Sequence, residues 1–170
     1  MEKCIDKLSS YNILNNILPG VAFCYLCNKL WQFNIVHYSL VENLFVFYFI
    51  GMIISRIGSL FVEPICKKLK IIIHYPYDCY MSASKKDDTI LVLSETNNTY
   101  RSIVALCIAL IHVKLFLLLK KMLWFSYISN WVIIFCVFII FVLSYRKQTK
   151  YIHNRIEIIS KGTTMNKENI

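Results

Sequence analysis

The segment at residues 43–70 constrains the fold more than any other part of this sequence. Between residues 44 and 62 the charged residue is Arg56, and most of the other side chains are apolar. This length is close to the ~20 residues that a helix needs to cross a hydrocarbon layer of ~30 Å. A soluble strand would be shorter, and a soluble amphipathic helix would show a polar face. We therefore predict a membrane-spanning helix at about residues 43–63, closed by Glu63 and the proline after it.

Arg56 places a charge inside this predicted span, roughly 5 Å from the bilayer centre at ~1.5 Å of rise per residue. Insertion of an arginine at such a depth costs about 2.5–3.5 kcal/mol, and these residues usually face a partner or a wet cavity. Glu63 lies about two turns further along the same helix face, so we expect Arg56 to find its partner on another helix or subunit. Two interpretations stay open: snorkelling with one interhelical salt bridge, or a gating or ion-path role.

Small residues recur along one side of the same predicted helix. In lipid, helices associate by close backbone approach and hydrogen bonding, so faces of small residues mark helix interfaces. The pattern predicts helix packing beside Arg56, and its members are Gly51, Ser55, Gly58 and Ser59.

Apolar side chains are too numerous for a soluble domain of this length, because 57% of the 170 residues are hydrophobic. We predict one all-α membrane domain, a four-helix transmembrane bundle with helices at about 13–36, 43–63, 102–119 and 122–145. The first helix is the weakest, since amides and Pro19 interrupt it, and a re-entrant or interfacial helix is the alternative. The remaining segments are a cytoplasmic loop at 64–101 and a cytoplasmic tail at 146–170, frayed after Ile159.

The predicted cytoplasmic loop carries two short β-branched runs, at 70–75 and 89–94, which are typical of strands. An amphipathic helix is expected between them, and Ser94 or Thr96 is expected to cap the next helix. Polar and aromatic side chains of the loop are candidates for contact with a cytosolic partner; they are Tyr77, Glu95, Asn97, Asn98 and Arg101.

Basic residues set the predicted orientation. With four spans and both termini in the cytoplasm, fourteen of the nineteen Lys and Arg residues fall on the cytoplasmic side. The excess of Lys and Arg in cytoplasmic segments explains the formal charge of +9, because the basic residues cluster at the ends of apolar runs. We therefore expect the lipid bilayer as partner and no direct binding of nucleic acid.

The sequence contains no convincing set of catalytic residues. The sequence lacks a Ser/His/Asp set, paired intramembrane carboxylates and an HExxH motif, so we predict no catalytic residues, cofactor or metal. Cys24 and Cys27 form a CxxC, and a membrane thiol oxidoreductase is a lesser alternative. That activity would need a second cysteine pair on the oxidising side, whereas Cys66 and Cys79 fall in the predicted cytoplasmic loop.

Three stretches, YNILNNILPG, ENLFVFYFIGMIISRIGSLFVEP and ASKKDD…LSETNNTYRS, resemble a group of small bacterial inner-membrane proteins of uncharacterised function. The resemblance covers about residues 11–115 and implies a multi-pass protein of the bacterial cytoplasmic membrane. Membrane proteins of this size recur in mobile defence loci, as sensors beside a cytosolic partner or as membrane-damaging effectors.

Two functions remain in competition at this point. The first is a non-enzymatic, homo-oligomeric membrane subunit, a sensor or effector in a bacterial antiviral or immunity system that acts through a cytoplasmic partner. The alternative is a small oligomeric ion channel or transporter that uses Arg56, His112 and Lys114, with anion selectivity following from a positive pore.

Overall fold

The structure is a computed structural model that describes residues 2–36, 38–73, 75–119 and 123–168, with side chains for 13, 15–36, 38–73, 75–119 and 131–160. Within these residues every regular element is helical, which confirms the predicted all-α class. The elements are α1 (Glu2–Trp31), α2 (Leu40–Ile57), a π-helical turn η1 (Gly58–Val62), α3 (Glu63–Lys68), α4 (Tyr77–Ser84), α5 (Thr89–Leu119) and α6 (Leu123–Glu168).

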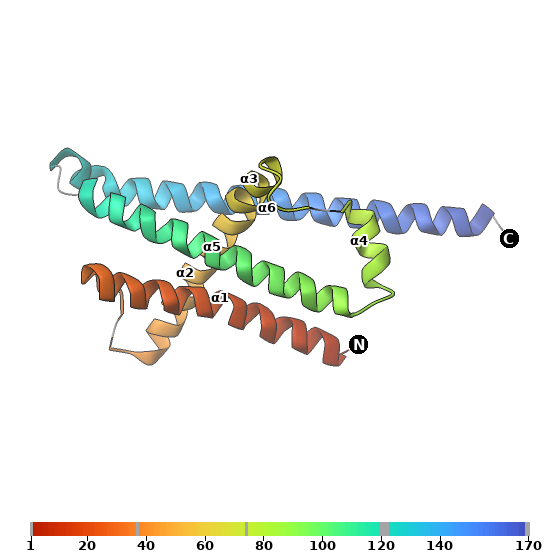
Figure 1. The fold of residues 1–170 in the computed structure, drawn as a ribbon, viewed down its shortest axis with the longest axis horizontal. Coiled ribbons are helices and arrows are strands. Elements are labelled where there is room, and N and C mark those ends of the chain that lie inside the picture. Colours follow the sequence, from red (N-terminus) through yellow and green to blue (C-terminus); the bar gives the residue numbers. More distant parts are fainter. Residues whose placement is uncertain (1, 37, 74, 120–122, 169–170) are drawn as a thin grey trace.

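The long helices α1, α5 and α6 follow the long axis of the molecule, and α2 crosses them obliquely (Figure 1). α2 contacts α1, α5 and α6, most extensively α1. A buried cluster of Ile54, Val62, Ala105 and Leu106 lies where α2 and η1 meet α5. The N-terminal end of α1 and the C-terminal end of α6 lie at the same end of the molecule (Figure 1).

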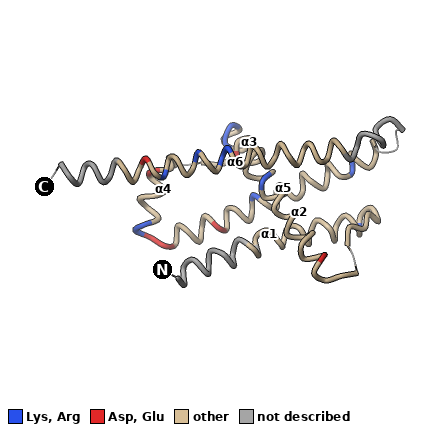
Figure 2. Tube along the Cα trace, turned by 180° about the vertical axis from the view of Figure 1, so that it is seen from behind, with Lys and Arg blue, Asp and Glu red and all other residues tan. Residues whose placement is uncertain are grey.

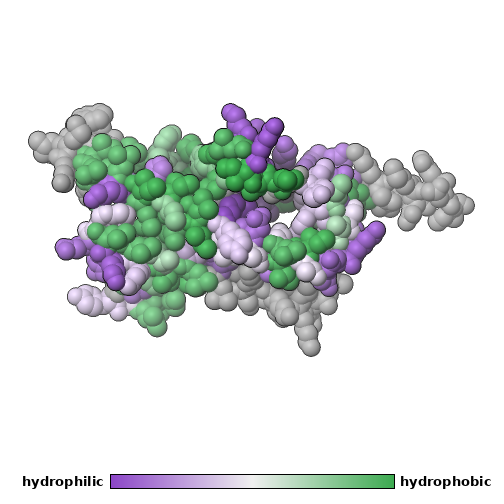
Figure 3. Space-filling model, in the orientation of Figure 1, coloured by the Kyte–Doolittle hydropathy of each residue, from purple (hydrophilic) through white to green (hydrophobic). Residues whose placement is uncertain are grey.

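Three helical segments of the described chain are long and apolar enough to cross a membrane: Leu40–Lys68, Thr89–Leu119 and Trp131–Ser160. Many of their large apolar side chains point outward, including Trp131, Phe135 and Phe138. On one face these side chains form a broad hydrophobic band, and hydrophilic residues flank it on either side (Figure 3). Exposed apolar surface of this extent marks contact with lipid or protein. The length and composition of these helices indicate a membrane protein, and α1 is not among the three segments.

The helix that begins at Leu40 continues past the predicted end at Glu63. Ser39 caps its start, accepting a hydrogen bond from the Glu42 N–H at 3.5 Å, which places the start before residue 43. At its other end the predicted closure by Pro64 is wrong, because η1 shifts the hydrogen bonding so that the Glu63 N–H donates to the Gly58 carbonyl. This wider turn lets the helix run through the proline to Lys68.

The predicted strand at 89–94 and the predicted helix start at 102 are also wrong. α5 begins at Thr89, where Asp87 Oδ1 accepts the Thr89 N–H at 2.9 Å and supplies the helix cap. Thr96 lies inside α5 and donates its hydroxyl to the Val92 carbonyl at 3.0 Å, so it caps nothing. The β-branched run is helical because capping and tertiary packing override a weak local preference. In the described part of 70–75 there is no strand.

The ends of the remaining helices differ from the predicted bounds as well. α1 starts at Glu2, keeps Pro19 in its interior and ends at Trp31, where Gln32 takes a left-handed φ of 54°. α6 continues to Glu168 without the predicted fraying after Ile159.

Candidate functional site

A buried carboxylate joins three helices at the junction of α3, α5 and α6. Glu63 is 7% exposed and accepts from Lys67 Nζ at 2.7 Å, Arg101 Nη1 at 2.9 Å and Lys147 Nζ at 3.2 Å. Figure 2 shows the basic positions of these helices gathered at this junction. We call Glu63, Lys67, Arg101 and Lys147 the carboxylate site.

Each helix contributes to the carboxylate site for a local reason. Lys67 follows Glu63 by one helical turn, a spacing that brings the two side chains together. Arg101 comes from the middle of α5 and Lys147 from α6. Removing the Glu63 carboxylate would leave three basic side chains close together, and breaking a buried charge pair in this way typically costs about 3–5 kcal/mol. The site therefore locks the relative positions of the three helices.

Lys147 also completes the backbone hydrogen bonding of η1. The Glu63 N–H donates to the Gly58 carbonyl, so the π-type donor for the Ser59 carbonyl would be the nitrogen of Pro64, which carries no hydrogen. Lys147 Nζ donates to this carbonyl at 2.6 Å and lies 2.8 Å from Ser59 Oγ. A buried carbonyl without a donor is costly. Lys147 thus makes the proline tolerable inside the helix.

Sequence reasoning singled out Glu63 and Arg101 but missed Lys67 and Lys147. Lys67 falls in the predicted cytoplasmic loop and Lys147 in the predicted cytoplasmic tail. The one available signal for Lys147 was its place just past an uncharged span, where it can reach a neighbouring helix. No protein-family model, curated protein or solved structure matches this chain. A function therefore has to come from its own residues.

The predicted small-residue face contacts three different helices in turn. A Cβ added at Gly51 would lie 1.6 Å from the Asn16 carbonyl oxygen of α1, so the two backbones touch there. Gly58 faces α5, where an added Cβ would meet Arg101 Cγ at 3.3 Å. Ser59 binds Lys147 of α6, and Ser55 is half-buried.

Gly20 of α1 completes the crossing with α2. A Cβ added at Gly20 would lie 1.8 Å from the Phe47 carbonyl oxygen. Gly20 follows Pro19, which the sequence analysis took as an interruption of the first helix. The sequence analysis recognised a row of small residues on α2 but none on α1. It therefore did not predict that Gly20 and Gly51 face each other where the two helices cross.

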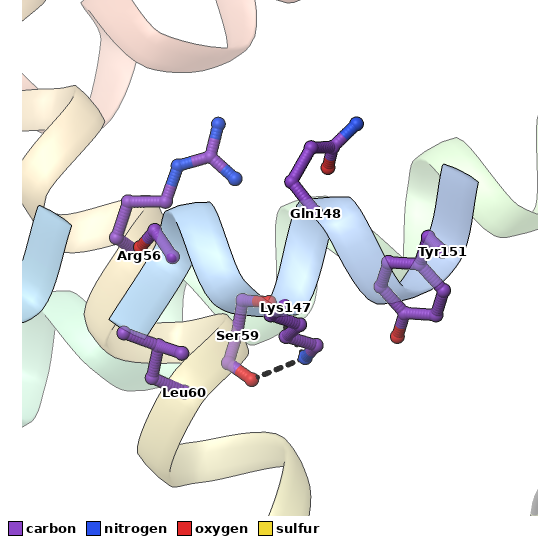
Figure 4. Close-up of a pocket in the computed structure, with 7 residues that line it drawn as sticks. Arg56, Ser59, Leu60, Lys147, Gln148 and Tyr151 are labelled. Carbon is purple, nitrogen blue, oxygen red and sulfur yellow. Dashed lines mark hydrogen bonds between the residues drawn. The ribbon is translucent and has the colours of Figure 1, made fainter. Parts of the chain in front are cut away.

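Arg56 lines a small cavity between α2 and α6 (Figure 4). The cavity has a volume of about 20 Å³ and is lined by Arg56, Ser59, Leu60, Ser144, Lys147, Gln148 and Tyr151. Among the described residues no ion pair or hydrogen bond involves the Arg56 guanidinium. The expected interhelical salt bridge of Arg56 is therefore absent from the described part of the chain, and the interhelical bridge belongs to Glu63.

The other predicted intramembrane residues lie elsewhere. His112 and Lys114 are exposed and lie about 17 and 20 Å along α5 from Arg101 at ~1.5 Å of rise per residue. His112 Nδ1 is 2.8 Å from the Ile108 carbonyl oxygen of its own helix. The structure does not bring these two side chains to Arg56.

The predicted cytoplasmic contact residues divide between interior and surface. Tyr77 of α4 packs its ring on Tyr151 of α6, with centroids 5.9 Å apart. Arg101 belongs to the carboxylate site. Asn97 is exposed, whereas Glu95 and Asn98 are half-buried.

The geometry of the described residues supports neither a reactive cysteine pair nor a metal site. Cys24 and Cys27 are both buried in α1 with free thiols. Reactive cysteines sit in partly exposed, electropositive surroundings, and buried thiols are usually structural. No group of His, Cys, Asp and Glu side chains among the described residues has the arrangement of a metal site.

Proposed function

We propose that this chain is a non-enzymatic membrane subunit that presents a helical arm to a cytosolic protein partner. The observation that carries the proposal is the length of α6, which has 46 residues and thus extends for about 69 Å. A hydrocarbon core of ~30 Å accommodates only ~20 of these residues. The part of α6 after Leu143, which we call the arm, then projects beyond the lipid as a continuous helix.

The arm carries an apolar stripe. Tyr145, Ile152 and Ile156 are 76%, 52% and 62% exposed, and together with Thr149 they follow a helical spacing that puts them on one face. An apolar helical face at this spacing is what helix-in-groove and helix-on-helix recognition use.

Charge along the stripe favours one class of partner. Three of the exposed charged residues beside the stripe, Arg146, Lys150 and Arg155, are basic, and one, Glu157, is acidic, so the net charge there is positive. Like charges facing each other would oppose pairing of two copies through their arms, whereas an acidic amphipathic helix would complement them. The predicted homo-oligomerisation would then use the membrane spans, not the arm.

The carboxylate site holds the base of the arm. Lys147 lies at this base and contacts both Glu63 and Ser59 of the helix that starts at Leu40. Four residues further on, Tyr151 packs against Tyr77 of α4. These contacts would fix the direction of the arm and couple a bound partner to the membrane helices.

Orientation follows the distribution of basic residues. We propose that the end bearing both termini faces the bacterial cytoplasm, since Lys and Arg concentrate in that part of the sequence. A four-helix membrane bundle would require α1 to cross as well. Reporter fusions in the loops on either side of α1 test this arrangement: opposite compartments support a crossing, and the same compartment leaves three spans.

Co-purification tests the proposed partner. The double variant Ile152→Asp/Ile156→Asp places two acidic groups in the stripe and should abolish recovery of a cytosolic protein that the wild-type chain retains. The variant His153→Asp/Asn154→Asp adds the same charge away from the stripe, at an exposed and a half-buried position, and should retain it. Equal recovery from both variants would refute the arm as binding surface. In a phage challenge, a defence role predicts loss of protection in the stripe variant alone.

An anion channel is the second candidate, and one observation favours it: Arg56 lies beside a cavity without a carboxylate partner among the described residues. Chloride flux through liposomes that contain the purified chain tests it. Flux that Arg56→Leu abolishes would support the channel, and absence of flux in the wild type would remove it.

A further inference from the structure

The turn that follows α3 combines exposed apolar side chains with exposed lysines. Leu69, Ile71 and Ile73 are exposed, Ile73 to 91%, and they alternate with Lys68 and Lys70. The sequence between residues 64 and 77 contains three lysines and no acidic residue. We call residues 68–73 the basic turn. Its composition is typical of segments that rest at a lipid surface, where apolar side chains enter the headgroup layer and lysines meet its charges.

We propose that the basic turn binds the phosphate headgroups of anionic phospholipids. Lys68 and Lys70 are exposed, and no ion pair between described residues involves either of them. Their charge is therefore available to a lipid, whereas Lys67 beside them is already bound to Glu63. Lysine binds phosphate as a point charge, so each lysine can meet a headgroup of its own and the binding requires no shared pocket.

The position of the basic turn favours a lipid over a soluble protein as its partner. The turn begins where the apolar segment Leu40–Lys68 ends. Figure 1 places α3 and the turn at the outer edge of the molecule, and Figure 3 shows hydrophobic and hydrophilic residues side by side there. A basic segment at the end of a membrane-crossing helix attracts anionic headgroups. The proposal rests on the membrane location of the chain and is independent of the arm and its partner.

The backbone at Lys70 gives a second, independent reason to assign a role to its side chain. Lys70 takes a left-handed φ of 56°. Its N–H donates to the Lys67 carbonyl at 3.1 Å, and the Ile71 N–H donates to the Cys66 carbonyl at 2.9 Å. This pair of hydrogen bonds ends a helix at a position where glycine is the usual residue, because a Cβ is unfavourable there. A lysine at a position that suits glycine points to a use for the ammonium group.

Thermal unfolding of the purified full-length chain in detergent tests the proposal. We expect a saturable rise in Tm with added dioctanoyl phosphatidylglycerol and a smaller one with dioctanoyl phosphatidylcholine, because a ligand that binds only the folded state raises Tm. High ionic strength should reduce the response to phosphatidylglycerol. Inorganic phosphate, which has no acyl chains, should not reproduce it. Equal rises with the two lipids, or an equal rise with inorganic phosphate, would overturn the proposal.

Two pairs of lysines locate the effect. Lys68→Gln/Lys70→Gln should raise the phosphatidylglycerol concentration that gives half of the Tm shift about 25-fold, since each lysine near an anionic surface contributes roughly fivefold. Lys85→Gln/Lys86→Gln removes the same charge from exposed positions after α4 and should leave that concentration unchanged. Equal lipid responses of the two variants would overturn the basic turn as the site.

Lys70→Gly separates the role of the side chain from that of the backbone. Glycine suits the left-handed φ at this position, so the Tm without lipid should equal or exceed that of the wild type. The phosphatidylglycerol concentration that gives half of the Tm shift should nevertheless rise about fivefold, because one lysine is lost. A variant that keeps the wild-type lipid response would overturn the binding role of Lys70.

Discussion

The Nζ atom of Lys147 lies 2.6 Å from the carbonyl oxygen of Ser59 and donates a hydrogen bond to it. The Glu63 N–H, the usual donor to that carbonyl, binds the Gly58 carbonyl instead, and the next nitrogen, that of Pro64, carries no hydrogen. A side chain from one helix therefore replaces a hydrogen bond that another helix cannot make. This contact joins the carboxylate site to the backbone of the helix that carries Arg56.

Lys147→Met should destabilise the fold by about 1–3 kcal/mol, since it leaves the Ser59 carbonyl without a donor. Pro64→Ala restores a backbone N–H, so the loss from Lys147→Met should be smaller in that background. A double-mutant cycle by unfolding in detergent measures this coupling. The exposed neighbour Lys150→Met serves as control. Equal losses in both backgrounds would contradict the compensation.

Glu63→Gln should lower the free energy of unfolding more than substitution of any one of its basic partners. It leaves Lys67, Arg101 and Lys147 close together without their shared carboxylate. We expect about 3–5 kcal/mol of lost stability, the range for breaking a buried charge pair. Glu42→Gln changes an exposed carboxylate on the same helix and should have little effect in the same unfolding assay. Similar losses from the two variants would speak against the carboxylate site.

Gly20→Ala and Gly51→Ala should each separate α1 from α2. The added methyl group would overlap a backbone carbonyl oxygen of the facing helix, 1.8 Å away at Gly20 and 1.6 Å away at Gly51. Overpacking of this kind costs about 1–3 kcal/mol, and more where backbone has to move. Gly58→Ala is the milder comparison, because its nearest neighbours would lie 3.3 Å away. Yield of folded protein and Tm give the ranking, and a Gly58 variant as damaged as the other two would refute it.

Asp87 should make the start of α5 sensitive to acid. Hydrogen bonds from Thr89 hold the pKa of the Asp87 carboxyl below its ordinary value of 3.8. Because the folded-state pKa is depressed, this contribution is fully present above the unfolded pKa and is lost as pH falls through the folded pKa. The protection factors of the amides in the first turn of α5 should fall over that acidic range in the wild type but not in Asp87→Asn. Asp88→Asn should keep the wild-type response.

Local apolar pattern predicted much of the fold but not the ends of its helices. Length and hydrophobicity suffice to predict an all-α chain, and the helices that start at Leu40 and Thr89 are long and apolar enough to cross a membrane. Their ends depend on Ser39, on Asp87 and on the π-helical turn, which are details of capping and hydrogen bonding. A polar segment next to an apolar run can be a loop or a continuation of the helix, and its polarity alone does not distinguish the two.

The candidate site was predictable only in part. Glu63 and Arg56 were recognisable because charges are rare in apolar runs, and Gly51 because small residues mark interfaces. The pairing of Glu63 with Arg101 and Lys147 joins residues 38 and 84 positions apart. Contacts over such distances arise from the packing of whole helices, which no local pattern contains.

Because α6 is one continuous helix, a tilt at Lys147 moves the whole part of the helix that follows. From there to Glu168 the helix extends for about 31 Å at ~1.5 Å of rise per residue. A tilt of roughly ten degrees at the membrane would swing the far tip by about 5 Å over that length. Small rearrangements among the helices packed around Lys147 would therefore move the tip by as much as the length of a side chain.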